Sequence, residues 1–109
     1  MKVFVAGPYT EGDIVINVRN AIDVGQCLLG AGHVPFVPHL YHFWHLLFPG
    51  PYTQWTRLSL EWLDVCDVLI RLPGDSPGAD VEELHAAKRN ILIFHSLAEF
   101  FRHPNSTIK

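Results

Sequence analysis

The chain has 109 residues, of which 49% are hydrophobic and 17% charged, a balance typical of one folded domain and unlike that of a disordered chain. Its formal net charge of -3 comes from 8 basic and 11 acidic residues that are scattered along the sequence, so no basic patch for a nucleic acid polymer is expected. The opening apolar run is too short for a signal peptide, and no later run reaches the length of a membrane span. We therefore expect a single cytoplasmic domain over residues 1–109 that binds neither a nucleic acid polymer nor a membrane.

The first third of the chain predicts a strand, a loop, a helix and a second strand. Residues 3–6 form a short apolar run that ends at a Gly-Pro pair, as a buried parallel strand does. Apolar residues then recur at helical spacing from Asp13, a candidate N-cap, to the glycines near residue 30. Residues 33–37 have the pattern of a second strand, and Pro35 places that strand at an edge of the sheet because proline has no backbone N–H.

The rest of the chain predicts an aromatic insertion followed by two more strands. Residues 38–51 are rich in histidine and aromatic residues and end in a Pro-Gly-Pro loop, so we expect a partly helical insertion over the binding face. Apolar periodicity predicts a helix from about 52 to 64, a strand at 67–72, a strand at 91–94 and a short helix at 97–101. Ser76 is a candidate N-cap for a further helix from 77 to about 88.

Strands that alternate with helices predict a parallel sheet with right-handed crossovers. The expected fold class is α/β, a flavodoxin- or Rossmann-like three-layer sandwich with four or five parallel strands in the order 2-1-3-4(-5). Ligands of such sheets bind beyond the carboxyl ends of the strands. The loops at 7–12, 38–54 and 73–78 should therefore meet at one face.

The segment from Gly74 to Glu82 brings acidic side chains into the first turns of a predicted helix. Glu82 would face the binding crevice, and a carboxylate near a helix N-terminus is favoured in its ionised form, which suits a nucleophile. Simple complementation of the helix dipole by Asp80, Glu82 and Glu83 is the alternative. Taken alone, the acidic residues of this turn favour complementation of the helix dipole over catalysis.

Several separated segments together resemble the nucleoside 2-deoxyribosyltransferase superfamily, which includes deoxynucleoside-monophosphate N-hydrolase-like proteins. Residues 3–9 (VFVAGPY) are similar to the family's opening strand and its Ala-Gly-Pro-aromatic loop. Residues 76–82 (SPGADVE) are similar to its motif of Ser or Asp, any residue, Gly, three residues and Glu. Residues 62–67 resemble the segment that precedes this motif. The matches cover almost the whole chain in the family's order.

The resemblance implies an enzyme that transfers or hydrolyses the (deoxy)ribosyl group of a small nucleoside or nucleotide, without a cofactor. In the family the Glu of the motif attacks the anomeric carbon and expels the base, and in this chain that residue is Glu82. Ser76 is closer to the N-hydrolase branch, since the transferases usually carry Asp there, and it is also the predicted N-cap. Enzymes of this fold commonly form dimers or larger assemblies, so we expect a homo-oligomer.

The candidate binding residues lie on the predicted loops. Tyr9 is expected to line the sugar or base pocket beside Gly7, although a packed core tyrosine fits the pattern equally. His39 and His42 are expected to face the pocket as hydrogen-bonding groups. Their three-residue spacing, continued by His45, does not match the i, i+4 pairs typical of helical zinc sites, so no metal is predicted. The other candidates on these loops are Pro8, Asp75, Ser76 and Gly78.

One position departs from the family's pattern. Relatives usually carry an Asp a few residues before the Trp-Leu pair, where it holds a sugar hydroxyl or assists proton transfer, and Ser59 stands in that place here. Glu61 and Asp64 lie in neighbouring turns at other spacings. Two further hypotheses therefore stay open: a non-catalytic module of the same fold that binds a nucleoside or nucleotide, and an interaction protein that uses the aromatic residues 38–62. Because loop 7–12 has no Arg or Lys, nucleosides are favoured over nucleotides.

Overall fold

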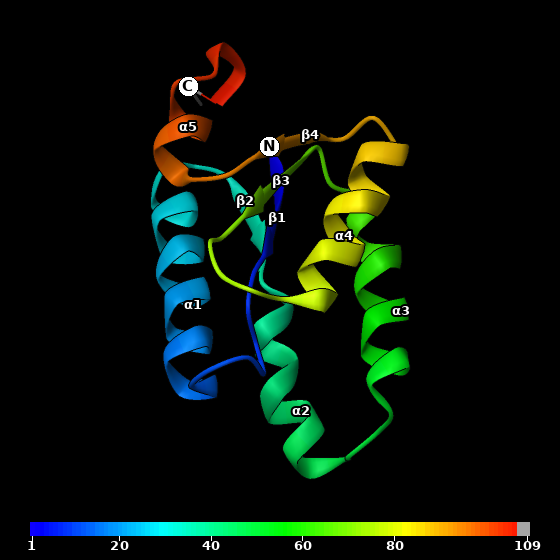
Figure 1. Ribbon diagram of the computed structural model, residues 1–109. Helices are drawn as coiled ribbons and strands as arrows, with labels where there is room; N and C mark the ends of the chain where they lie inside the picture. The colour runs from blue at the N-terminus through cyan, green and yellow to red at the C-terminus, as the bar shows by residue number, and fades with distance from the viewer. Residues whose placement is uncertain (107–109) are drawn as a thin grey trace.

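The computed structural model describes residues 1–106, and residues 107–109 of the predicted domain lie outside the described part. One sheet of parallel strands forms the centre of the molecule, and the strands lie in the order β2-β1-β3-β4 (Figure 1). The predicted flavodoxin-like order is confirmed, with four strands in the described part. The strands are β1 (Lys2–Ala6), β2 (Val34–Phe36), β3 (Val68–Arg71) and β4 (Leu92–Phe94).

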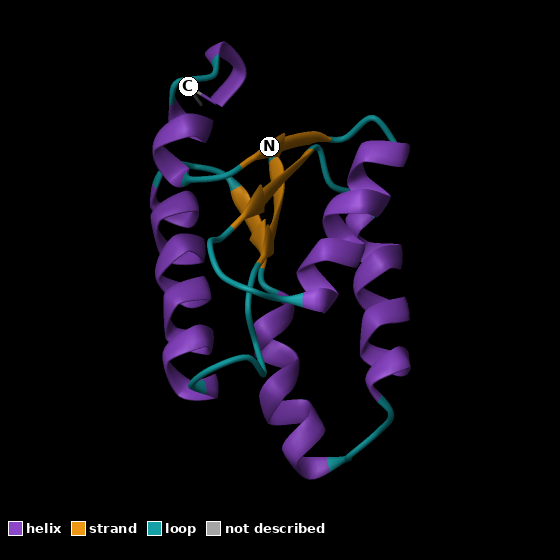
Figure 2. Cartoon of the chain, viewed as in Figure 1, coloured by secondary structure: helices purple, strands orange, loops and turns teal. Residues whose placement is uncertain are grey.

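Helices cover both faces of the sheet, so the molecule has three layers (Figure 2). One face packs against α1 (Ile14–Gly30) and α5 (Leu97–Phe101), and the other packs against α3 (Tyr52–Leu63) and α4 (Pro77–Lys88). The predicted insertion is indeed partly helical: a 3-10 turn (Pro38–Leu40) leads into α2 (Tyr41–Leu47), and a second 3-10 turn (Pro104–Ser106) follows α5. Figure 1 shows that α2 projects beyond the carboxyl ends of the strands.

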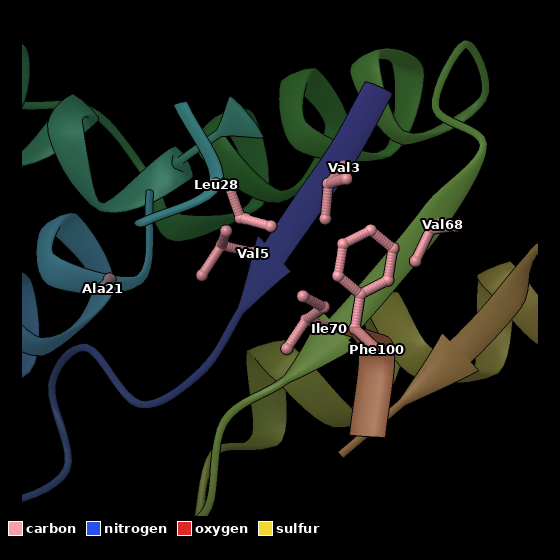
Figure 3. Packing of buried hydrophobic residues seen from close by; sticks show 7 residues of the cluster. All are labelled: Val3, Val5, Ala21, Leu28, Val68, Ile70 and Phe100. Carbon is pink, nitrogen blue, oxygen red and sulfur yellow. The ribbon is translucent and has the colours of Figure 1, made fainter. Parts of the chain in front are cut away.

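β1 is buried on both of its faces. Alternate side chains of a strand point to opposite sides of the sheet. Val3 and Val5 pack toward α1 and α5 (Figure 3), whereas Phe4 and Ala6 pack toward α3 and α4. All four residues are 0% exposed, which explains why this strand is an unbroken apolar run rather than an alternating one.

The two N-cap residues predicted from the sequence mark the starts of α1 and α4. Asp13 accepts a hydrogen bond of 3.1 Å from the N–H of Ile16 at the start of α1. Ser76 accepts one of 3.1 Å from the N–H of Ala79 at the start of α4, with Pro77 in the first helical position. Pro35 lies in β2, which occupies an edge of the sheet as predicted.

Of the helices formed by residues 1–106, none has the length and apolar character needed to cross a membrane.

Candidate functional site

A cavity of about 500 Å³ lies at the carboxyl edge of the sheet. Its walls come from the loops that follow β1, β2 and β3 and from helices α2, α3 and α4, so the three loops expected to share a face do so. Eight of the residues predicted for the site line this cavity: Gly7, Tyr9, His39, His42, Ser59, Ser76, Gly78 and Glu82.

Pro8 and Asp75, which were also expected at the pocket, lie outside its lining. The side chain of Asp75 is exposed to solvent. Pro8 is close to the loop after β3: Gly74 has a φ of +114°, and a Cβ on Gly74 would lie 2.9 Å from Pro8 Cγ. Glycine adopts this backbone conformation without strain, and its missing side chain permits the close approach. Pro8 therefore supports the loop that carries the motif.

Glu82 is the only Asp or Glu that lines the cavity in the described part of the chain. It is 9% exposed and lies in the second turn of α4, which begins at Pro77. Burial raises the pKa of Glu82 to about 8, and the charge of Arg71 only partly offsets this effect. The carboxyl of Glu82 is therefore less readily ionised than an exposed one, the opposite of the direction expected from its place near the helix N-terminus.

Arg71, at the end of β3, holds the motif loop in place without lining the cavity. Its guanidinium donates hydrogen bonds to the carbonyl oxygens of Leu72 (3.0 Å) and Gly74 (2.8 Å) and to the carboxylate of Asp80 (2.8 Å). The side chain is 11% exposed. Sequence analysis did not identify this role, although a single basic residue at the end of an apolar strand is a signal for it.

His39 and His42 lie at the cavity, and the hydrogen bonds of His39 define which of its ring nitrogens carries the proton. The Nε2 of His39 donates to the carbonyl oxygens of Gly7 (3.2 Å) and Pro8 (2.9 Å), so Nδ1 is left as an acceptor. Burial lowers the pKa of His39, which keeps its ring neutral. The hydroxyl of Tyr9 and Nδ1 of His42 share a hydrogen bond of 2.5 Å, and burial raises the pKa of Tyr9.

The histidines at the cavity are bonded to protein groups. Over residues 1–106, no group of three or more His, Cys, Asp or Glu side chains is arranged to hold a metal ion. Instead, each histidine ring is engaged by a neighbouring protein group. Nδ1 of His45 accepts a hydrogen bond of 3.0 Å from the indole N–H of Trp55, which ties α2 to α3 along the outer wall of the cavity.

Two tyrosines of the aromatic insertion line the cavity without having been singled out from the sequence. Tyr41 begins α2 and Tyr52 begins α3. The hydroxyl of Tyr52 reaches to α4, where a Cβ on Gly78 would lie only 2.0 Å from it. A larger residue at position 78 would displace the exposed Tyr52 side chain from this contact. Among so many aromatic residues, spacing along the sequence could not distinguish these two.

Ser59 and Ser76 are both buried at the cavity. The hydroxyl of Ser76 caps α4, as predicted, and also lies 3.5 Å from the carbonyl oxygen of Gly7. Glu61 and Asp64 do not line the cavity. Asp64 instead accepts a hydrogen bond of 2.6 Å from His85 between α3 and α4. Neither acid therefore supplies a second carboxylate to the described cavity lining.

The 2-1-3-4 parallel sheet, with helices on both faces and a cavity at its carboxyl edge, defines a flavodoxin-like α/β protein. The chain is similar in structure to a 2-deoxyribosyltransferase from the psychrotolerant bacterium Bacillus psychrosaccharolyticus, with a TM-score of 0.56 and 15% sequence identity. The alignment covers 100% of this chain and 98% of that chain, so the two share their overall fold. No family model matches the sequence, and no curated protein matches it significantly.

Proposed function

We propose that residues 1–109 act as a single domain that transfers or hydrolyses the (deoxy)ribosyl group of a small nucleoside or nucleotide, with Glu82 as the nucleophile. The observation that carries this proposal is the position of Glu82, the only carboxylate on the described cavity lining, at the carboxyl edge of the sheet. The fold shared with a 2-deoxyribosyltransferase supports the same assignment.

The proposed reaction follows the chemistry of retaining glycosidases. An oxygen of the ionised Glu82 carboxylate forms a bond to the anomeric carbon, while the bond from that carbon to the base breaks and its electron pair leaves with the base. Water or a second base then attacks the same carbon and releases Glu82. No cofactor takes part. Because burial raises the pKa of Glu82 to about 8, the reactive ionised form is the minor one at neutral pH in the free protein.

The charges around the cavity favour a neutral ligand. No Lys or Arg of residues 1–106 lines the cavity. A phosphate would depend on backbone amides, on Ser76 and on histidine rings, and His39 is held neutral by burial. The volume of about 500 Å³ lies within the range of roughly 300 to 1,000 Å³ that is usual for small-molecule sites. We therefore favour nucleosides over monophosphates as substrates.

The test is detection of free base after incubation with a panel of nucleosides and monophosphates, with and without an acceptor base. Glu82→Ala should abolish base release. Glu83→Ala, one position along the same helix and outside the cavity lining, is the matched control and should retain it. Dependence on the acceptor identifies a transferase, and release into water identifies a hydrolase. Base release that persists in Glu82→Ala would refute the assignment.

A non-catalytic nucleoside- or nucleotide-binding module of the same fold is the second candidate. The observation in its favour is Ser59, which lies buried at the cavity in the place where relatives usually carry an Asp. Glu82 then has no second acid beside it on the described cavity lining to assist departure of the base. Calorimetric binding of a nucleoside without release of base would support this alternative.

We also propose that the chain forms a homo-oligomer. Helix α2 contains no buried residue, and the apolar side chains on it and at its C-cap are more than half exposed. Exposed apolar patches of this kind commonly mark protein interfaces. Sedimentation equilibrium tests the proposal, since a monomer at all concentrations would contradict it. The exposed side chains are Phe43, Trp44, Leu46, Leu47 and Phe48.

A further inference from the structure

Tyr41 presents a buried hydroxyl that has no hydrogen-bond partner among the described residues. Its side chain lines the same cavity as Glu82. The ring packs against Phe36, Trp44 and Trp55, with ring centroids 6.0, 6.1 and 5.5 Å away respectively. Three aromatic neighbours hold the ring in place, so the hydroxyl has a fixed position at the cavity although nothing in the described chain binds it.

An unpartnered hydroxyl in this position is costly for the folded protein. Nearly all buried polar groups in native proteins have a hydrogen-bond partner, and leaving one unpaired destabilises the fold. The aromatic neighbours of Tyr41 would pack equally well against phenylalanine. The hydroxyl therefore points to a partner that is absent from the chain itself, namely a ligand in the cavity.

The hydroxyl of Tyr41 is a donor, and its surroundings restrict the group that accepts from it. Burial, followed by the negative charge of Glu82, raises the pKa of Tyr41 to about 12, so the phenol keeps its proton. An anionic acceptor is disfavoured, because no described Lys or Arg lines the cavity to balance its charge. The acceptor is therefore a neutral oxygen or nitrogen.

A second buried atom, Nδ1 of His39, also has no partner in the described chain, and it indicates that the ligand group is a hydroxyl rather than a carbonyl. Nδ1 of His39 is an acceptor, since Nε2 of the same ring donates to backbone carbonyl oxygens. A single ligand group that satisfied both atoms would accept from Tyr41 and donate to His39. Hydroxyl groups do both, whereas carbonyl oxygens only accept.

We propose that Tyr41 donates a hydrogen bond to a sugar hydroxyl of the bound ligand, next to Glu82. This inference rests on the proposed function, because the sugar is the part of a nucleoside that must lie against the nucleophile. Tyr41 is then a substrate-binding residue that is supplied by the helical insertion after β2.

The test is a cycle of paired changes in the protein and in the ligand. Calorimetry in the Glu82→Gln protein, which prevents turnover, gives the dissociation constants of adenosine and uridine and of their 2′-, 3′- and 5′-deoxy analogues. Tyr41→Phe should weaken binding of a ribonucleoside by roughly ten-fold. The same substitution should have no effect on binding of the one analogue that lacks the contacted hydroxyl.

The thermal midpoint of the free protein separates this binding role from a structural one. Because the hydroxyl has no partner in residues 1–106, Tyr41→Phe should leave the midpoint unchanged or raise it. Three outcomes would overturn the proposal: a clearly lowered midpoint, equal weakening of binding for every analogue, or no binding of either nucleoside series by the parent protein.

The proposed function and this inference can fail separately. If base release does not need Glu82 but the cycle shows coupling between Tyr41 and one hydroxyl, the nucleophile is misassigned and the binding site stands. If base release needs Glu82 but Tyr41→Phe binds every analogue as the parent does, only the role of Tyr41 is wrong.

Discussion

Replacement of Glu82 by glutamine should change how the stability of the protein depends on pH. Glu82→Gln keeps the size of the side chain and removes its titration. The pKa of about 8 in the folded protein lies above the ordinary value of 4.5, so between these pH values the folded state holds a proton that the unfolded chain has released. The contribution of this group to stability is complete below about pH 4.5 and is lost as the pH rises through about 8.

The size of the effect follows from the two pKa values. At about 1.4 kcal/mol for each pH unit, the interval from 4.5 to about 8 corresponds to an upper limit of about 5 kcal/mol. Such a loss is large beside the total stability of roughly 5 to 15 kcal/mol that is usual for a small protein. Because water entry and local relaxation reduce the cost of a buried charge, we expect a loss of roughly 2 to 4 kcal/mol.

Urea denaturation followed by tryptophan fluorescence, at several pH values from 4.5 to 9, measures the effect. The unfolding free energy of Glu82→Gln minus that of the parent protein should increase as the pH rises from 4.5 to about 8, and it should level off above that pH. Glu83→Gln, at the less buried neighbouring position, is the control for general effects of charge removal. Parallel pH profiles for Glu82→Gln and the parent would show that the Glu82 carboxyl is not desolvated and would refute the reasoning.

Two further substitutions test the contacts around the cavity. Gly78→Ala should displace the Tyr52 side chain, since its Cβ would lie 2.0 Å from the Tyr52 hydroxyl, but the thermal midpoint should change little, because Tyr52 is 57% exposed and can rotate aside. A large fall in the midpoint would show that the Tyr52 side chain cannot move away. Arg71→Met should raise the pKa of Glu82 further, because the Arg71 charge lowers it; carboxyl carbon-13 NMR measures this, and a lowered pKa would contradict it.

Local sequence patterns were sufficient to predict most of the fold. The apolar run of β1 reflects burial on both faces, and the caps Asp13 and Ser76 mark where α1 and α4 begin. The edge position of β2 followed from Pro35. These signals depend on neighbouring residues and on the periodicity of strands and helices, and both are present in the sequence itself.

The candidate site was predicted less completely, because its properties depend on contacts between distant segments. The resemblance of residues 76–82 to a known motif and the sheet topology predicted Glu82 at the cavity, but its raised pKa results from burial among elements that only the fold brings together. Tyr41 lies at the cavity because it begins α2, directly after the turn that follows β2 at the carboxyl edge of the sheet, and no periodicity signals that arrangement. Asp75 belongs to the motif loop, yet the cap at Ser76 starts the helix after it and leaves its side chain exposed.

β1 lies between β2 and β3 in the sheet, although it is the first strand along the chain. Its pairing with β3 brings together groups 65 residues apart, as in the hydrogen bond from the N–H of Lys2 to Asp67. A nascent chain that ends before β3 can pair only β1 with β2, and a two-stranded sheet is marginally stable. Large loops must close before the central pairs form, which slows folding. The sheet, and with it the cavity at its edge, should therefore form late in synthesis, after β3 has left the ribosome.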